Sequence, residues 1–140
     1  MRRLMLMNGS YLLDTNIVIS LFANEDEVIR RLGGAFRAYV PSIVLGELYY
    51  GAYKSSHSKA NIAKIDSFAL KSSVVACDVE TSRHYGRIKD HLRSKGKPIP
   101  ENDIWIAALA RQHNLILVTR DQHFQNIKDI ITEKWQLIHQ

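Results

Sequence analysis

Short apolar segments alternate with segments of helical periodicity along most of this chain, and this alternation constrains the fold more than any other feature. Largely apolar runs predict strands over 10–13, 35–40, 73–77, 115–119 and 135–138. Between them, apolar residues recur at helical spacing over 16–22, 25–32, 42–53, 59–70, 80–92 and 102–113. Strands that alternate with helices build parallel sheets covered on both faces. We therefore predict an α/β fold around a buried parallel sheet.

The length of the chain, 140 residues, is that of one ordinary domain. We expect a short N-terminal extension over 1–9 and a single domain over 10–140. The one cysteine, Cys77, excludes a disulfide framework and a multi-cysteine zinc site. The sequence has no apolar run near the roughly 18 residues of a membrane span. It also lacks the apolar stretch of a signal peptide after its first arginines, so we expect a cytoplasmic protein.

Acidic residues follow two of the predicted strands and begin one of the predicted helices. Asp14 directly follows the strand 10–13, and Asp121 lies two residues after the strand 115–119. Asp103 lies in the first turn of the helix that leads, antiparallel, into that later strand. The carboxyl ends of parallel strands meet at one edge of a sheet, where ligands bind in open α/β folds. We therefore expect these three carboxylates to converge.

A fourth acid, Glu47, interrupts an otherwise apolar helical segment over 43–50. An ionised carboxylate there is costly unless it is paired, bound to a metal or turned to solvent. Four carboxylates in one pocket repel one another and raise some of their pKa values. A hard divalent cation such as Mg²⁺ or Mn²⁺ relieves that repulsion and prefers oxygen ligands.

The net charge of the chain indicates which class of substrate such a metal site could act on. The chain has 19 Lys and Arg residues against 14 Asp and Glu residues, a net charge of +5, which favours anionic partners such as nucleic acid. A carboxylate-held metal on a basic protein suggests hydrolysis of phosphodiester bonds by metal-activated water.

Each acid also has a purely structural explanation. Asp14 or Asn16 can cap the following helix, and Asp103 can offset the helix dipole. Asp121 can form a turn, and Glu47 can extend to solvent. These explanations account for each acid separately, but not for three acids at one edge with a fourth in an apolar helix.

Four motifs, in this order, resemble those of PIN-domain nucleases: LLDTN at 12–16, GEL at 46–48, ENDIWIAALA at 101–110 and TRDQHF at 119–124. The resemblance extends over about 10–139 and is strongest to the VapC-type toxins of bacterial and archaeal toxin–antitoxin pairs. It implies a PIN-like, three-layer α/β/α fold with a five-stranded parallel sheet. It also implies a single-strand-specific endoribonuclease that depends on Mg²⁺ or Mn²⁺. A homodimer and a cognate antitoxin, whose tail can block the active site, are the implied partners.

The resemblance also assigns roles to individual residues. The acidic metal-binding positions of the family fall at Asp14, Glu47, Asp103 and Asp121. The polar positions beside them fall at Thr15, Asn16 and Thr119. We expect the three aspartates to hold the metal, directly or through water. The glutamate is either a further ligand or the group that orients or deprotonates the attacking water, and the two threonines orient the carboxylates.

Basic residues that contact substrate phosphates are harder to identify. Arg120, beside Asp121, is predicted to lie at the edge of the sheet itself. Arg83 and Arg87 lie one turn apart on the helix 80–92, and a solvated helix face explains them equally well. His123 lacks metal-ligand spacing, and we expect it at the surface without a role in the site.

Three other functions compete with this interpretation. A phosphotransferase of the haloacid dehalogenase type needs a second acid two residues after the first, where this chain has Asn16. A receiver-like module needs no acid in an apolar helix, and it needs a lysine after a late strand. The remaining alternative is a non-catalytic RNA-binding or regulatory domain of the same fold, against which the complete set of four acids argues.

Overall fold

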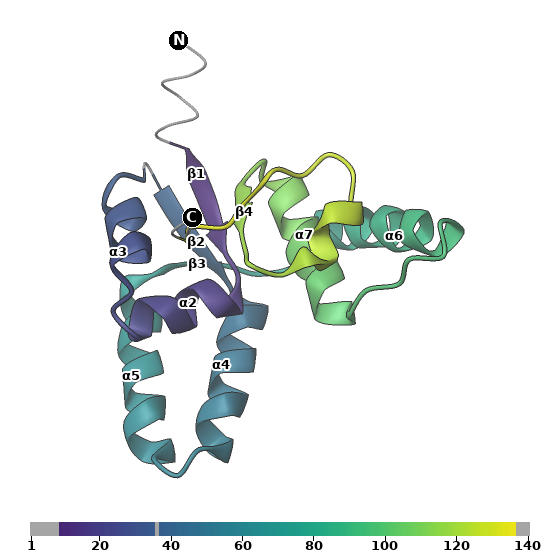
Figure 1. Cartoon of the computed structure of the whole chain (residues 1–140). Helices are drawn as coiled ribbons and strands as arrows, with labels where there is room; N and C mark the ends of the chain where they lie inside the picture. Colours follow the sequence, from purple (N-terminus) through teal and green to yellow (C-terminus); the bar gives the residue numbers. More distant parts are fainter. Residues whose placement is uncertain (1–8, 36, 137–140) are drawn as a thin grey trace.

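Five parallel strands form a single sheet at the centre of the molecule (Figure 1). The strand order is β3-β2-β1-β4-β5. The strands are β1 (Ser10–Leu13), β2 (Arg37–Pro41), β3 (Ser73–Val75), β4 (Ile116–Val118) and β5 (Thr132–Glu133). This confirms the predicted five-stranded parallel sheet. The computed structural model describes residues 9–35 and 37–136, so all but the last residue of the expected N-terminal extension lies outside the described residues.

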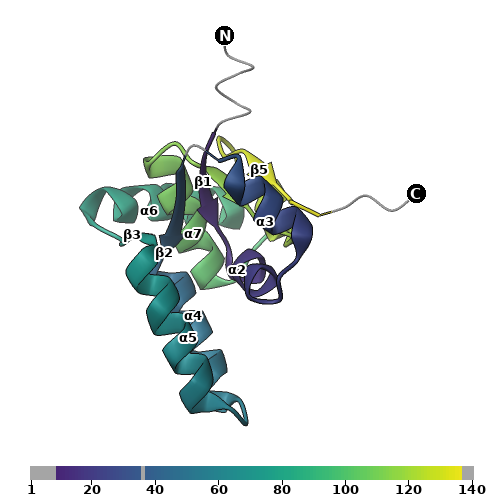
Figure 2. The same ribbon diagram turned by 90° about the vertical axis from the view of Figure 1, so that its left-hand side faces the viewer.

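Helices cover both faces of this sheet, which confirms the three predicted layers. They are α2 (Thr15–Phe22), α3 (Asp26–Gly33), α4 (Ser42–Lys54), α5 (Ser58–Lys71), α6 (Val79–Ser94) and α7 (Glu101–Gln112), with the 3₁₀ helix η1 (Gln122–Asn126). Figure 2 shows α2 and α3 on one side of the sheet and α6 and α7 on the other. The helices α4 and α5 form a hairpin that extends beyond the sheet. Within the described part of the chain, every helix is too short or too polar to cross a membrane.

The fifth strand lies earlier in the chain than predicted. We expected it over 135–138, but β5 pairs with β4 through Thr132 and Glu133. Trp135 has a positive φ of 51°, which strand backbone does not adopt, and its buried ring packs edge-on against Tyr11. The apolar run therefore marks an anchor in the core rather than a strand; residues 137 and 138 lie outside the described residues.

The helix α7 is the most buried helix and sets the position of the site. Six of its twelve residues are buried, because it packs between the sheet and α6. Asn114, with a φ of 54°, turns the chain so that the Leu115 N–H donates to the Ala110 carbonyl at 2.9 Å. The chain then returns as β4, antiparallel to α7. The first turn of α7 therefore lies at the same edge as the end of β4.

The register of β1 and β4 brings their carboxyl ends to one level. Leu13 lies opposite Val118, and the Asp14 N–H donates to the Val118 carbonyl at 3.0 Å. Asp14 and Thr119, which are 105 residues apart in the sequence, therefore leave the sheet side by side. This edge carries the candidate site.

Candidate functional site

Asp14 is the most buried of the four predicted acids, with 5% of its surface exposed. Its Oδ1 accepts a hydrogen bond from the Thr15 N–H at 2.8 Å, which caps α2. Its Oδ2 accepts one from the buried Thr119 hydroxyl at 2.6 Å. The same Thr119 oxygen accepts the Asp121 N–H at 3.0 Å. The Thr119 hydroxyl therefore links Asp14, after β1, to the backbone of Asp121, after β4. The helix cap uses only Oδ1 of the two Asp14 carboxylate oxygens.

Asp103 and Asp121 meet at the imidazole of His123. The His123 Nδ1 lies 2.8 Å from Asp103 Oδ2 and 2.9 Å from Asp121 Oδ1. One ligand atom from each of the three residues fits within 4.8 Å of the others. The structure thus places Asp103 and Asp121 together, as the sequence predicts.

His123 is exposed, as expected, but the prediction that it has no metal-ligand arrangement is wrong. Asp121 Oδ1 accepts the His123 backbone N–H at 3.0 Å and begins η1. The tight turn of η1 directs the imidazole back toward the two aspartates. An aspartate two residues before a histidine, at the start of a helical turn, is the signal in the sequence that identifies this arrangement.

Glu47 reaches the site from α4. Its Oε1 accepts a hydrogen bond from the Thr15 hydroxyl at 3.0 Å. Thr15 also donates its backbone N–H to Asp14, so this residue links the two carboxylates. Glu47 is exposed, whereas its neighbour Leu48 is buried. The carboxylate therefore escapes the cost of burial on the solvent side of α4 while it stays next to the other acids.

Burial and mutual repulsion disfavour the ionised forms of these acids. Burial raises the pKa of Asp14 against the opposing effect of its two hydrogen bonds, and the nearby Asp103 and Glu47 carboxylates raise it further. Burial also raises the pKa of Asp103, and Asp121 adds to the increase. The hydrogen bond to Asp103 raises the pKa of the His123 imidazole. Burial is the largest cause for the two aspartates, and the negative charge of neighbouring acids adds to it.

Asn16 links the two strand ends through the backbone. Its Oδ1 accepts the Arg120 N–H at 3.3 Å. This bond holds the loop after β4 against the start of α2, and thus keeps Asp121 close to Asp14. Asn16 is therefore placed beside the acids, as predicted, although its side chain contacts the chain rather than a carboxylate.

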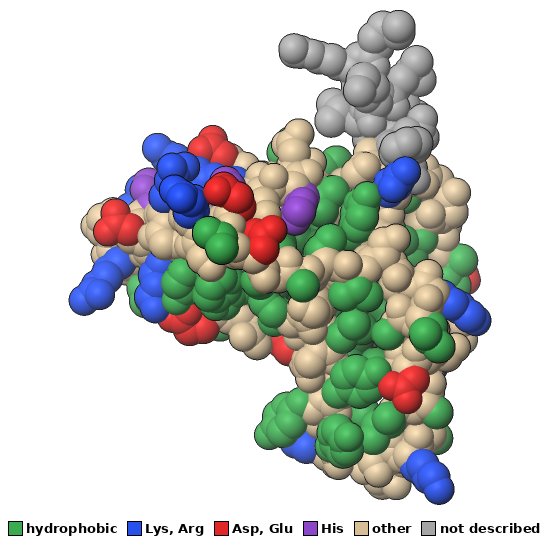
Figure 3. Space-filling view, turned by 180° about the vertical axis from the view of Figure 1, so that it is seen from behind, with side chains coloured by type: hydrophobic (Ala, Val, Ile, Leu, Met, Phe, Trp, Pro, Cys, Tyr) green, Lys and Arg blue, Asp and Glu red, His purple; other side chains and the backbone are tan. Residues whose placement is uncertain are grey.

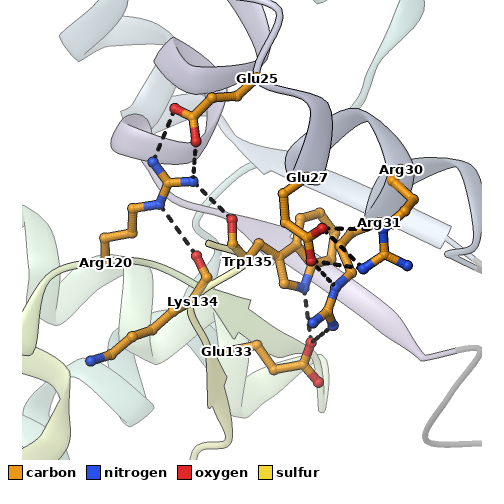
Figure 4. A network of polar contacts seen from close by, with 8 residues as sticks. All are labelled: Glu25, Glu27, Arg30, Arg31, Arg120, Glu133, Lys134 and Trp135. Atoms are coloured by element: carbon orange, nitrogen blue, oxygen red, sulfur yellow. Dashed lines mark hydrogen bonds and ion pairs between the residues drawn. The ribbon is translucent and has the colours of Figure 1, made fainter. Parts of the chain in front are cut away.

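The Arg120 side chain has a different set of partners from the predicted substrate phosphate (Figure 4). Its Nη atoms donate to both Glu25 carboxylate oxygens at 2.7 and 3.1 Å and to the Ser20 hydroxyl at 2.8 Å. The carbonyls of Lys134 and Trp135 accept two further bonds, at 3.4 and 2.8 Å. All five N–H donors of the guanidinium are therefore used within the molecule.

The two predicted arginines of α6 lie away from the acids. Arg83 forms an exposed ion pair with Glu80 at 3.3 Å. Arg87 lines a separate cavity together with Arg111 and Lys128. Among the described residues, neither arginine forms a hydrogen bond or ion pair with the acidic cluster.

An apolar groove begins at the cluster and extends between α2, α4 and α5. Its volume is about 290 Å³. Thr15 and Glu47 lie at its acidic end, and Ile19, which is 54% exposed, lies in its wall. The rest of the lining is Phe22, Leu48, Gly51, Ala52, Asn61, Lys64 and Ile65. The site therefore adjoins a surface suited to an apolar segment of another chain.

Comparison with known proteins gives consistent matches over nearly the whole chain. Ribonuclease VapC2 of Haemophilus influenzae is 41% identical over 128 residues, which cover 89% of this chain and 97% of that protein. The tRNA(fMet)-specific endonuclease VapC of Shigella flexneri is 33% identical over 128 residues, with the same coverage.

Solved structures agree. A chain of the DNA-bound VapBC complex from Salmonella typhimurium superimposes with a TM-score of 0.85 at 30% identity, covering 91% of this chain and 99% of that one. The family model described as the PIN domain matches residues 11–130. That range begins in β1, contains all four acids and ends just before β5. Its extent, together with the relatives, shows that the chain belongs to the PIN domain family.

Proposed function

We propose that this chain is a metal-dependent endoribonuclease that hydrolyses phosphodiester bonds in RNA and acts as the toxin of a toxin–antitoxin pair. The observation that carries the proposal is the convergence of four acids from four separate segments at one edge of the sheet. The ribonuclease and endonuclease names of its relatives support the reaction. The VapBC complexes among its structural neighbours support the biological role.

The donor set fits Mg²⁺ or Mn²⁺. Asp103, Asp121 and His123 offer ligand atoms within 4.8 Å of one another, and Asp14 is joined to Asp121 through one hydroxyl. Carboxylate oxygens are the ligands that both ions prefer, whereas an imidazole nitrogen favours Mn²⁺ over Mg²⁺. The raised pKa values of Asp14 and Asp103 are the electrostatic penalty that a cation there removes.

The residues of the chain would divide the catalytic work. A bound divalent cation supplies a nucleophilic water at neutral pH and neutralises charge on the phosphodiester. Asp14, Asp103 and Asp121 would hold it, and Thr119 fixes the carboxylate of Asp14 and the backbone of Asp121. Glu47 is the most exposed of the four acids and is held by Thr15. It is therefore best placed to orient the attacking water and accept its proton.

An antitoxin and a second copy of the chain are the proposed protein partners. The apolar groove between α2, α4 and α5 ends at Thr15 and Glu47. An antitoxin tail that lies in this groove would reach the acids and block access to them. The VapBC complexes from Salmonella typhimurium and Rickettsia felis support such a partner.

Cleavage of bulk small RNA by the purified protein tests the proposal. Discrete fragments are expected with Mn²⁺ or Mg²⁺ and none with a chelator. The Asp103→Asn variant should cleave at least about 100-fold more slowly, because it loses a carboxylate that holds the cation. Asp26→Asn, which changes an exposed acid in the first turn of α3, is the matched control and should retain the wild-type rate.

The alternative, a non-catalytic RNA-binding or regulatory domain, makes the opposite prediction. It requires that wild type and Asp103→Asn have equal effects on RNA and on the growth of cells that express them. That result would exclude the proposed catalysis.

A further inference from the structure

We infer that a cation-lined cavity between α6, α7 and the segment after η1 binds a backbone phosphate of the RNA substrate. This inference rests on the proposed function and adds a second contact point to it. The cavity measures about 330 Å³ and has an apolar floor. Its polar wall contains Arg87, Asp90, His91, Arg111 and Lys128.

The positive charges of this wall come from three separate elements. Arg87 lies on α6, Arg111 in the last turn of α7, and Lys128 shortly after η1. Arg87 and Lys128 have no ion-pair partner within the described residues, and Arg111 uses its Nη2 for the exposed Asp129 at 2.8 Å. Three cations and one acid, Asp90, line the cavity, so its potential is positive and attracts anions. Figure 3 shows Lys and Arg side chains gathered over this end of the molecule.

A buried polar atom in the same wall lacks a partner. The Nε2 of His91 is buried and forms no hydrogen bond within the part of the chain that the structure describes. Buried polar atoms in folded proteins are nearly always hydrogen-bonded. Arg87 and His91 lie one helical turn apart and share a face of α6. A phosphate in the cavity would give the arginine a counter-charge, and a rotation of the imidazole toward the cavity would give the buried nitrogen an acceptor.

The cavity and the acidic cluster lie at opposite ends of the same two elements. Asp103 is in the first turn of α7 and Arg111 in its last turn. Asp121 is the N-cap of η1 and Ile127, which lines the cavity, is its C-cap. The eight residues from Asp103 to Arg111 span roughly 12 Å along the helix. The two sites are therefore held at a nearly constant separation.

This separation suits a single RNA strand. With a rise of about 3.4 Å per nucleotide for a stacked strand, roughly 12 Å corresponds to three or four nucleotides. An RNA whose scissile phosphate lies at the acids would present a second phosphate near Arg87 and Lys128. The cavity thus provides a sequence-independent contact that positions the strand.

Salt-dependent RNA binding tests the inference. Binding of a single-stranded RNA would be measured across salt concentrations in an Asp103→Asn background, so that cleavage does not interfere. The double variant Arg87→Ala/Lys128→Ala should bind more weakly, and the slope of log K against log salt should fall by about 0.7 for the lost phosphate contact. Arg93→Ala/Lys95→Ala removes the same charge from exposed positions outside the cavity and should keep the slope of its parent.

Two further arms separate the possible failures. If the wild-type protein cleaves RNA but Arg87→Ala/Lys128→Ala keeps the slope of log K against log salt, the inference is overturned and the proposed function stands. A wild-type protein that fails to cleave RNA with Mn²⁺ and Mg²⁺ would contradict the proposed function itself. Inorganic phosphate could instead raise the melting temperature of the protein only when Arg87 is present, while the cavity variant keeps the slope of log K against log salt for RNA binding. That result would assign the cavity to a free anion and would also overturn the inference.

Discussion

At the scale of single residues, Thr119 connects more of the site than any charged group. Its hydroxyl donates to Asp14 and accepts from the Asp121 backbone, and its side chain is 2% exposed. A hydroxyl has one hydrogen to donate and two lone pairs to accept with. Thr119 therefore determines both the rotamer of one acid and the loop position of another.

Thr119→Val tests this role because it keeps the shape of the side chain and removes the hydroxyl. We expect about 10- to 100-fold weaker Mn²⁺ binding and a similar loss of RNA cleavage, as for other groups that orient metal ligands. Calorimetric titration with Mn²⁺ measures the affinity. Thr132→Val, on the exposed side of β5, is the control. Wild-type Mn²⁺ affinity in Thr119→Val would contradict the role.

At the scale of elements, Arg120 holds the last part of the chain against α3. Figure 4 shows its guanidinium between Glu25, at the N-cap of α3, and the Lys134 and Trp135 carbonyls. A second bridge lies beside it, in which Arg31 contacts Glu133 at 3.9 Å. These contacts tie α3, β4 and the segment after β5 together.

Arg120→Lys distinguishes this structural role from the predicted contact with substrate. A lysine keeps the positive charge but cannot reproduce the planar fork of five donors. The structural role predicts a melting temperature lower by about 5 °C, with RNA affinity preserved below the transition. Differential scanning fluorimetry and filter binding measure the two quantities, with Arg83→Lys as the exposed control. Weaker RNA binding at an unchanged melting temperature would instead support a contact between Arg120 and substrate.

Local rules predict the sheet and the convergence of Asp14, Asp103 and Asp121, whereas Glu47 is predicted from its apolar surroundings and from the family resemblance. An apolar run followed by Asp14 places that acid at the carboxyl edge of a parallel sheet, whatever the loops do.

The Ser20 and Glu25 partners of Arg120 lie 100 and 95 residues away in the sequence, and its other two partners are backbone carbonyls 14 and 15 residues away, so no local pattern reveals them. The spacing of Asp121 and His123 signals a helical turn that starts at the aspartate, but propensity does not specify the direction in which that turn points the imidazole.

Glu47 shows why apolar periodicity alone does not determine burial. The segment 43–50 is apolar around Glu47, which leaves burial and exposure both open; the structure exposes Glu47, and Tyr50 is 65% exposed. The reason is that α4 and α5 project beyond the sheet (Figure 2), so much of the apolar surface of α4 has no core to cover it. Tertiary arrangement decided the environment of this carboxylate.

At the scale of the whole molecule, the fold assembles a cluster of like charges, and the cation that we propose would relieve their repulsion. The raised pKa values of Asp14, Asp103 and His123 mean that the folded state binds protons more tightly than the unfolded state. Stability therefore falls as pH rises through these groups. Acids with lowered pKa values, such as Asp78 and Glu101, act in the opposite direction, but they lose their contribution only at pH values near 4 and below.

Metal removal should consequently make stability fall as pH rises above about 4, the ordinary pKa of the carboxyl groups, and further above about 6.5, the ordinary pKa of His123. With a chelator, we expect the melting temperature to fall as pH rises, because the acids ionise and the contribution of His123 is lost above its raised pKa. Mn²⁺ at about 100 times its dissociation constant should restore about 2.7 kcal/mol. Asp14→Asn should weaken both effects, whereas Asp26→Asn should leave them unchanged. If the melting temperature of the wild type changes with pH in the same way with and without Mn²⁺, the acidic cluster is not the site at which Mn²⁺ acts.

The pairing of β1 with β4 has a consequence for how the protein is made. Asp14 is translated 105 residues before Thr119, and Asp121 follows two residues later. A ribosome-bound nascent chain cannot assemble the cluster until these two later residues have emerged. Hydrolysis that depends on these acids can therefore begin only after the segment that contains Thr119 and Asp121 has left the ribosome.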